Sequence, residues 1–257
     1  MASPVFAPRV LAYSIVIPVH NEEDQIRITV ENLIEEFRRE SIISYEIVLV
    51  DDNSEDNTAM ILEELKGKYS TVRPIHRTSP CGFGRAIRDG ITHANGNVIC
   101  IVMGDESDIP EDVIKLLKKV DEGFDVAYGN RFLPQSKIVD YPILKFYVNR
   151  FANHLFRLMF RISDKDISNA FKAYHYSVFN RIGPIESTQF DITLELPVKA
   201  HLIRCSHASV PVKWMGRKSG VTKFSLIRMC RPYILTALKL FLLSLVPTKM
   251  AKNFHNV

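Results

Sequence analysis

The stretch from Val98 to Lys119, VICIVMGDESDIPEDVIKLLKK, places an apolar run directly before a cluster of acidic residues. The apolar run Val98–Met103 predicts a buried strand, and the pattern after Asp108 predicts a helix that ends near Asp121. Carboxylates at the end of a buried strand are suitable ligands for Mg²⁺. A D-x-D spacing would supply two of them, but position 103 is Met. The stretch therefore has two interpretations, a metal site with one ligand missing or only an acidic helix start.

Short apolar runs and amphipathic helices alternate through the first 130 residues. Strands are expected at residues 13–19, 45–50, 72–76, 98–103 and 126–129, and helices at 22–37, 58–68, from 82 onward and at 108–121. The first helix repeats apolar residues on one face, and its first turn should hold Glu22 and Glu23, where the helix dipole favours acids. Apolar strands separated by helices predict an α/β fold with a mainly parallel sheet covered on both faces.

Polar residues gather where the predicted strands end. Ligands of such sheets bind beyond the carboxyl ends of the strands, so these residues are the candidate site. The four groups are Pro18–Glu22, Asp51–Asp52, Gly82–Arg85 and Asp105–Asp108. The glycine-rich turn is neither a G-x-G-x-x-G dinucleotide motif with a downstream acid nor a P-loop.

The two halves of the chain carry opposite charge. Residues 1–130 hold 13 Lys and Arg against 23 Asp and Glu, a balance of −10, whereas residues 131–257 hold 20 against 6, a balance of +14. Solvated faces vary in sign, but a split of this size favours an anionic partner for the second half, either nucleic acid or an anionic membrane surface.

The second half contains two basic, apolar helical segments. Residues 141–160 read as a basic aromatic helix, and the apolar run from Ile234 to Val246 is interrupted by Lys239. This run has about 13 residues, short of the roughly 20 that a spanning helix needs. We expect an amphipathic helix in the membrane interface, with a helix packed on the domain or a true span as the alternatives.

The four cysteines and the N-terminus indicate where the chain works. Cys81, Cys100, Cys205 and Cys230 show no C-x-x-C spacing, so we expect reduced thiols, no zinc site and a cytosolic environment. The N-terminal residues lack a charged start followed by a long apolar core and do not resemble a signal peptide.

Several motifs together resemble one family. IVIPVHNEEDQI, EIVLVDDNSEDNT, the Gly82–Ala86 turn and VMGDESDIPED occur in an order and at distances similar to family 2 glycosyltransferases with the GT-A nucleotide-sugar fold, a Rossmann-like mixed sheet. YGNRF, YPILKFYVNRFANHLF, DISNAFKAY, FDITLEL and WMGRKSGVTK resemble the dolichyl and polyprenyl-phosphate mannose or glucose synthases of that family. The resemblance covers roughly residues 13–225. It implies a GT-A domain at 1–225, with a nucleotide-sugar half (1–130) and an acceptor half (131–225), and a membrane-associating helical tail at 226–257.

The resemblance implies that the first half binds the donor nucleotide sugar. Pro18 turns the chain outward after the first strand, and His20 could stack on a base or serve only as the helix entry. Glu22 could contact the donor or only the helix dipole. Asp51 is expected to contact the base or ribose, with Asp52 as a second contact or as ordinary turn chemistry. Gly82 to Arg85 would let a ligand approach the backbone closely and offer amide donors at a helix start.

Asp105 is the expected ligand of Mg²⁺ or Mn²⁺, which would bridge it to the donor diphosphate. Ser107 is a weaker candidate ligand, through water. Asp108, Pro110 and Glu111 match a capping box with Asp108 as the N-cap. Since Met103 replaces a first Asp, we expect a site with one protein carboxylate and weak metal affinity in the absence of donor.

The resemblance also implies an acceptor site in the basic half. Arg131 would bind the acceptor phosphate, together with Lys145 and Asn149, although Asn replaces the small hydroxyl residue that is usual in the family. Asp166 matches the family's acidic residue, but Asn169 and Ala170 replace the turn that follows it. Arg217 and Lys223 resemble a basic loop that clamps the donor diphosphate and the acceptor.

The expected reaction is transfer of a sugar with inversion to a polyprenyl phosphate, at the cytoplasmic face of a membrane. The acceptor phosphate is already anionic, so it needs little help from a base. A second interpretation transfers the sugar to a saccharide hydroxyl, for which Asp166 or Asp191 would be the base. A nucleic-acid-binding protein is a third, but no nucleic-acid motif is present. Beyond substrates, a homo-oligomer and a separate membrane partner both stay open.

Overall fold

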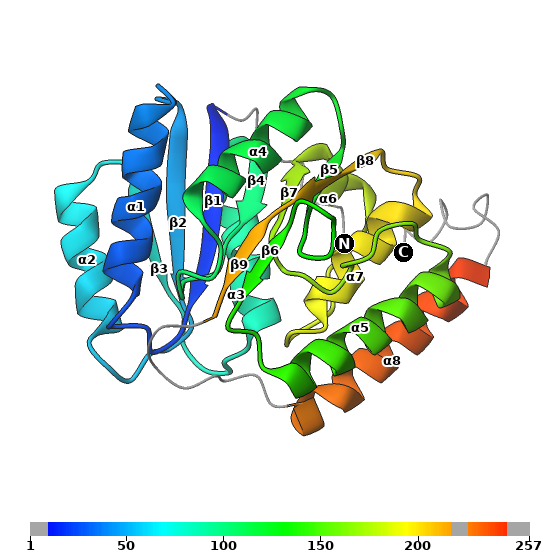
Figure 1. Cartoon of the computed structure of the whole chain (residues 1–257). Helices are drawn as coiled ribbons and strands as arrows, with labels where there is room; N and C mark the ends of the chain where they lie inside the picture. Colours follow the sequence, from blue (N-terminus) through cyan, green and yellow to red (C-terminus); the bar gives the residue numbers. More distant parts are fainter. Residues whose placement is uncertain (1–9, 217–225, 246–257) are drawn as a thin grey trace.

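Seven strands form one mixed sheet in the order β3-β2-β1-β4-β7-β5-β8 (Figure 1). The computed structural model describes residues 10–216 and 226–245. Strand β7 runs antiparallel to both of its neighbours, and the other pairs are parallel. The strands are β1 (Leu11–Val19), β2 (Tyr45–Asp51), β3 (Val72–His76), β4 (Gly96–Ile101), β5 (Val126–Asn130), β7 (Lys172–His175) and β8 (His207–Pro211). The mainly parallel α/β fold is thus confirmed.

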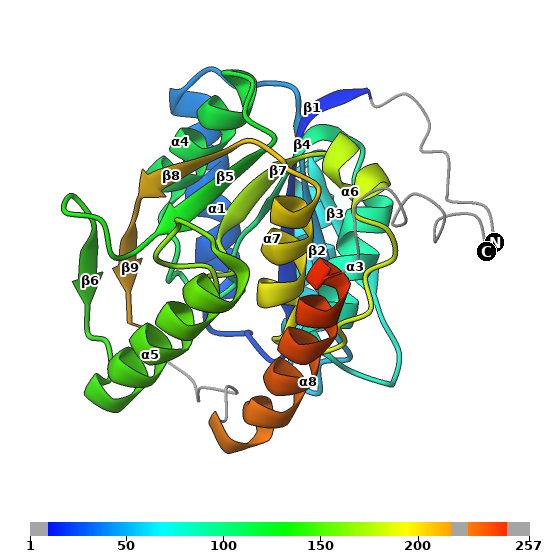
Figure 2. The same cartoon turned by 90° about the vertical axis from the view of Figure 1, so that its right-hand side faces the viewer.

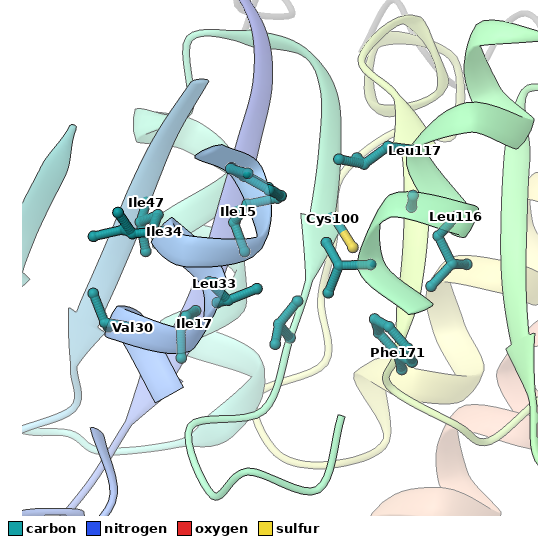
Figure 3. Packing of buried hydrophobic residues seen from close by; sticks show 14 of the residues in the cluster. Ile15, Ile17, Val30, Leu33, Ile34, Ile47, Cys100, Leu116, Leu117 and Phe171 are labelled. Carbon is teal, nitrogen blue, oxygen red and sulfur yellow. The ribbon is translucent and has the colours of Figure 1, made fainter. Parts of the chain in front are cut away.

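Helices cover both faces of this sheet. They are α1 (Ile26–Arg39), α2 (Thr58–Lys68), α3 (Phe83–His93), α4 (Pro110–Asp121), α5 (Ile143–Phe160), α6 (Ser177–Arg181), α7 (Ile192–Leu202) and α8 (Leu226–Leu245). On one face α1, α2 and α4 pack on side chains such as Ile15, Ile47 and Cys100 (Figure 3). On the other face α3, α6 and α7 pack on the alternate residues of the same strands, among them Val16 and Val48. Because side chains alternate along a strand, an apolar strand supplies both cores.

Helices α5 and α8 form an outer layer beside α7 (Figures 1 and 2). Phe156 and Phe160 of α5 and Ala237 and Leu240 of α8 are buried in a third apolar cluster that includes α7. Within residues 10–216 and 226–245, no helix has the length and apolarity required to cross a membrane. The domain boundary expected at residue 225 stays a prediction.

The first helix starts later than its sequence suggests. Helix α1 begins at Ile26 and has no acid in its first turn, so the placement of Glu22 and Glu23 there was wrong. The backbone amide of Glu22 donates instead to Thr58 Oγ1 over 2.8 Å, and that of Glu23 donates to Asp56 Oδ2 over 3.3 Å. Side chains at the start of α2 therefore hold the loop after β1 in a non-helical path.

The capping box expected at Asp108 is also absent. Helix α4 has Ile109 as its N-cap, without a side-chain capping bond, and Pro110 in its first turn. The Asp108 carboxylate points the other way and accepts a 3.0 Å hydrogen bond from the Met103 amide. This hydrogen bond closes residues 103–108 into a loop, and strand β4 ends before it, at Ile101.

A small parallel sheet of β6 (Lys137–Val139) and β9 (Lys213–Met215) lies next to that loop. Strand β9 is fixed to it by a bridge between Trp214 and Asp108 and by a 3.2 Å hydrogen bond from the Met215 amide to the Ser107 carbonyl.

Candidate active site

The carboxyl ends of three adjacent strands bring the first groups of polar residues together. Strands β2, β1 and β4 are neighbours, and Val19 pairs with Asp51 at the end of the β1–β2 register. The His20 Nδ1 atom donates to the Asp52 carbonyl over 3.0 Å, which fixes the ring of His20 against the end of β2. Pro18 lies within β1 and pairs with Val50 of β2, so the prediction that it turns the chain outward after the strand was wrong. The half-buried Glu22 follows in the loop to α1. The sheet thus gathers these residues at one edge, as parallel strands require.

Asp51 is buried, and both carboxylate oxygens have protein partners. Its Oδ1 atom accepts from the Ser54 amide over 3.0 Å, and its Oδ2 atom lies 3.1 Å from His76 Nδ1. Burial alone would lower the pKa of His76, but the hydrogen bonds to Asp51 and Glu63 raise it above its ordinary value. Asp51 is therefore held in one orientation at the edge where a nucleoside is expected.

Asp52 joins the end of β2 to the start of α3. Its Oδ2 atom accepts from the Gly82 amide over 2.6 Å, and its Oδ1 atom forms an ion pair with Arg77. Arg77 in turn donates from Nε to Asp89 Oδ2 over 2.5 Å. Since Asp52 is itself buried, this network positions the turn before α3.

At the glycine turn, another segment of the same chain lies against the backbone, at the place where a close approach by a ligand was expected. A Cβ atom on Gly84 would lie 2.7 Å from the carbonyl oxygens of both Ser187 and Gln189, so only glycine fits. The Arg85 amide donates to the Thr188 carbonyl over 3.4 Å, and the Arg85 guanidinium donates to the Cys81 carbonyl over 2.9 Å. The amides of Gly82 and Arg85 are thus used inside the protein, and their predicted contact to the donor stays a prediction.

Asp105 lies in the loop after β4 and is half-buried. Its Oδ1 atom accepts from the Ser107 amide over 3.2 Å. Ser107 itself is only 2% exposed, which makes it harder for a cation to reach. Among the described residues, no group of three or more His, Cys, Asp or Glu side chains could hold a metal ion. The hard oxygen donor of Asp105 suits Mg²⁺ or Mn²⁺ when phosphate oxygens and water supply the other ligands.

The neighbouring carboxyl group of Asp108 has a different environment. Burial raises its pKa to about 7; the Met103 amide opposes the shift and the charge of Asp105 adds to it. Because its carboxylate closes the loop between Met103 and Asp108, it shapes the backbone around Asp105.

Arg131 follows β5 and forms a buried ion pair with Asp166. The guanidinium contacts both carboxylate oxygens, from Nε over 2.7 Å and from Nη2 over 2.8 Å, and the Arg131 amide adds a bond of 3.0 Å. Burial opposes the charge of Arg131, but the coulombic effect of Asp166 prevails and raises the pKa of the guanidinium. Asp166 is fully buried and accepts on both oxygens, an arrangement that orients Arg131 and is unsuited to a general base.

Lys145 on α5 and Arg131 both lie close to the ring of Tyr141. The Lys145 Nζ atom and the Arg131 guanidinium carbon are each 5.8 Å from the centre of the Tyr141 ring. Arg150, which the sequence did not single out, has its guanidinium carbon 4.3 Å from the centre of the Phe132 ring. The structure thus collects three cations around two aromatic rings, a pattern for which the mixture of basic and aromatic residues in 141–160 is the sequence signal.

Asn149 also lies on α5 but has a structural partner. Its Nδ2 atom donates to Ser168 Oγ over 3.2 Å, and Asn153 binds both Ser168 and Asn149. This ties α5 to the loop that carries Asp166. The predicted contact of Asn149 to an acceptor phosphate stays a prediction.

Two further predicted site residues, Arg217 and Lys223, lie outside the described residues. Asp191 lies at the start of α7 and is buried; its Oδ2 atom accepts from Thr236 of α8 over 2.8 Å, and its Oδ1 atom accepts from the Gln189 amide over 3.1 Å. Like Asp166, it serves as an internal acceptor.

The sequence has relatives among known proteins. The sequence model described as Glycosyl transferase family 2 matches residues 14–183. The chain is 28% identical over 217 residues to a polyprenol monophosphomannose synthase of Mycolicibacterium smegmatis, covering 82% of this chain and 80% of the relative. It is 31% identical over 216 residues to a dolichol-phosphate mannosyltransferase of Pyrococcus furiosus, covering 82% of this chain and 58% of the relative.

A solved structure shows the same fold. It is glucosyl-3-phosphoglycerate synthase from Mycobacterium tuberculosis in complex with Mn²⁺, uridine diphosphate and glucosyl-3-phosphoglycerate. It superposes with a TM-score of 0.64 at 16% identity, over 90% of this chain and 80% of that one. The mixed sheet is therefore the GT-A fold, and the chain belongs to glycosyl transferase family 2.

Proposed function

We propose that this glycosyltransferase moves a hexose from a nucleotide-diphosphate sugar to the phosphate of a polyprenyl lipid, with inversion at the anomeric carbon. One observation carries the proposal. The cations Arg131 and Lys145 both lie close to the Tyr141 ring, and Lys145 is on α5, the helix that also carries a large exposed apolar surface. An anionic group and a hydrocarbon chain could thus be bound side by side. The names of the two relatives point to the same class of acceptor.

Helix α5 carries an apolar stripe on its solvent side. Ile143, Leu144, Tyr147, Phe151 and Leu158 are 66–76% exposed. Tyr147, Phe151 and Leu158 follow Leu144 by three, seven and fourteen positions, and this spacing places the four residues on one helical face. The opposite face is buried against the protein, so the exposed stripe has no role in the core.

Helix α8 repeats this arrangement beside α5 (Figure 2). Ile234, Leu235, Leu238 and Leu242 are 51–65% exposed, while Ala237 and Leu240 are buried. We call the two exposed stripes of α5 and α8 the apolar platform. Exposed apolar surface on this scale marks an interaction site.

We assign the apolar platform to a membrane surface. It lies in the half of the chain that carries the +14 balance, and Lys145, Arg150 and Lys239 are on the same two helices. Basic residues next to an apolar helical face favour anionic lipid headgroups. The protein would act as a peripheral enzyme at the cytoplasmic face, with its acidic half directed away from the lipid.

The acceptor chemistry fits the residues present. A phosphate monoester is ionised at neutral pH and can attack without deprotonation by a base. Arg131, fixed by Asp166, would orient the phosphate oxygen, and Lys145 would balance its charge. A saccharide hydroxyl would need a free carboxylate, but both predicted candidates, Asp166 and Asp191, are buried and accept hydrogen bonds on both oxygens.

The donor would bind along the ends of β1, β2 and β4. Asp51 would contact the nucleoside, and Asp105 would hold Mg²⁺ or Mn²⁺ against the diphosphate. When bound, the cation supplies positive charge that stabilises the leaving nucleoside diphosphate. Arg217 and Lys223 are proposed to contact the same phosphates.

The direct test is incubation with radiolabelled nucleotide sugars, each supplied with polyprenyl phosphate, polyprenol or an oligosaccharide. The proposal predicts a labelled lipid from which mild acid releases the labelled sugar, formed only with polyprenyl phosphate. A labelled oligosaccharide without a lipid product would support the hydroxyl-acceptor reaction instead.

A further inference from the structure

His76, the last residue of β3, lies between two carboxylates. Its Nδ1 atom is 3.1 Å from Asp51 Oδ2, and its Nε2 atom is 3.0 Å from Glu63 Oε1 of α2. An ionised carboxylate only accepts hydrogen bonds, so both ring nitrogens must carry a hydrogen for both bonds to form. The geometry therefore requires the doubly protonated, positively charged imidazole.

The charges around His76 favour this state. Burial lowers its pKa, but the two hydrogen bonds and the two negative charges outweigh burial. The other charges nearby are already paired, since Lys66 lies 3.0 Å from the second oxygen of Glu63 and Arg77 binds Asp52 and Asp89. Conversely, the hydrogen bond from His76 is the largest cause that lowers the pKa of Glu63.

This cluster contributes little to the hydrophobic core. The side chains of His76 and Glu63 are 40% and 49% exposed, whereas that of Asp51 is 5% exposed. The ring thus reaches from the surface to a buried carboxylate whose other oxygen is held by the Ser54 amide. Two opposed hydrogen bonds fix the plane of the Asp51 carboxylate at the carboxyl end of β2.

We propose that His76 is a positioning residue for the donor, which holds the Asp51 carboxylate in the orientation that contacts the nucleoside as long as its Nδ1 atom carries a hydrogen, as it always does in the doubly protonated ring. The inference rests on the proposed function, in which Asp51 contacts the donor. It makes the affinity for the nucleotide dependent on pH through a residue that touches neither the sugar nor the phosphates.

The sign of the pH dependence follows from the hydrogen bonds. Below the pKa of His76 both bonds are present, and nucleotide binding is tight. As pH rises through that raised pKa, the ring loses one proton and can donate to only one carboxylate. Nucleotide affinity then falls, because the neutral tautomer with its hydrogen on Nε2 no longer donates to Asp51, whereas affinity for the acceptor phosphate is not affected by this group.

Two variants separate the hydrogen bond to Asp51 from the charge. His76→Asn places an amide nitrogen near the position of Nδ1 and can still donate to Asp51, whereas His76→Gln places it near Nε2 and can donate only to Glu63. We expect His76→Asn to bind nucleotide as the parent does at pH 6.5 and to keep that affinity at higher pH. His76→Gln and His76→Ala should bind about tenfold more weakly, as loss of one charge-assisted hydrogen bond predicts.

The experiment is titration calorimetry of the full chain with GDP and UDP in the presence of Mg²⁺, between pH 6.5 and 9. Asp51→Asn is the reference for loss of the nucleoside contact, and a thermal melt of each variant checks its fold. Parent-like binding by all three His76 variants at every pH would overturn the role of His76 and leave the proposed function intact. Failure of the parent to bind any nucleoside diphosphate would overturn both.

Discussion

The pair of Arg131 and Asp166 shows how a buried carboxylate supports a cation. A bidentate ion pair with one fully buried partner leaves an uncompensated charge when the other is removed. We therefore expect Asp166→Asn to lower the free energy of unfolding by about 3 kcal/mol, measured by urea denaturation. Weakened acceptor binding should accompany this loss, because the guanidinium is no longer oriented.

The same variant tests the alternative role of Asp166. If Asp166 were a general base, Asp166→Asn would abolish turnover with little change in stability or in acceptor KM. Asp191→Asn is the matched control, since Asp191 is also buried but accepts from Thr236 and has no ion pair with Arg131. The Asp191→Asn variant should weaken the attachment of α8 and leave phosphate binding largely unchanged.

Asp105 is a half-buried carboxylate of the loop after β4 and a suitable cation ligand. We predict that Asp105→Asn reduces turnover at least about a hundredfold and removes its sensitivity to EDTA, because a single-carboxylate site has no replacement. The measurement is sugar transfer with and without added Mn²⁺. Turnover by Asp105→Asn that EDTA still inhibits would remove Asp105 from this role.

The same site should bind a metal weakly until the donor arrives. Since residue 103 is Met and Asp108 is directed to the Met103 amide, phosphate oxygens must supply further ligands. Titration of Mn²⁺ followed by electron paramagnetic resonance should show millimolar affinity alone and at least tenfold tighter binding with a nucleoside diphosphate. Equally tight binding in both cases would mean that the protein supplies more ligands than Asp105.

Helices α5 and α8 account for the apolar platform, and its side chains can be changed without disturbing the core. Phe151 is 71% exposed and Leu242 is 65% exposed. Replacing both with Ser should weaken binding to vesicles of anionic lipid by at least about tenfold, since each large side chain contributes roughly 1.5–3 kcal/mol when removed from water. Sedimentation with the vesicles measures this.

Met60 of α2 provides a matched control for the platform variants. It is 58% exposed but lies in the acidic half. Met60→Ser should therefore leave vesicle binding unchanged. If Met60→Ser and the platform variants bind alike, the apolar platform does not contact the lipid.

The helices and strands differ in how well their sequences predict them. Helix α2 and strand β3 have the predicted bounds, because polar or turn-forming residues flank each of them. The predicted starts of α1 and α4 were wrong. Before α1, side chains distant in the sequence accept from the backbone amides, and before α4 the Asp108 side chain accepts from an earlier amide and does not cap the helix. The antiparallel direction of β7 could not be predicted, because its short sequence carries no information on its neighbours.

Across the whole molecule, the predictable part of the site is the part that the sheet creates. Parallel strands bring Asp51 and Asp105 to one edge, and their place at strand ends is visible in the sequence. The partners of the site residues cannot be read from the sequence. His76, the partner of Asp51, lies 25 residues beyond it, and Asp166, the partner of Arg131, lies 35 residues beyond it. Their pairing depends on the order of the strands rather than on any local pattern.

The charge separation and the apolar platform belong to the whole chain as well. A basic half that carries exposed apolar helices and an acidic half without such helices would give the enzyme one preferred orientation on an anionic bilayer. In this orientation Arg131 and Lys145 would be near the headgroups, where a polyprenyl phosphate presents its phosphate. The acceptor would then need no extraction into water.

The measurement that decides the account is the choice of acceptor in vesicles that contain either polyprenyl phosphate or the matching polyprenol, with a panel of labelled nucleotide sugars. We predict transfer only to polyprenyl phosphate, and loss of this transfer in Arg131→Ala without loss of nucleoside diphosphate binding. Transfer to polyprenol or to a soluble saccharide at an equal or greater rate would contradict the assignment of the acceptor site.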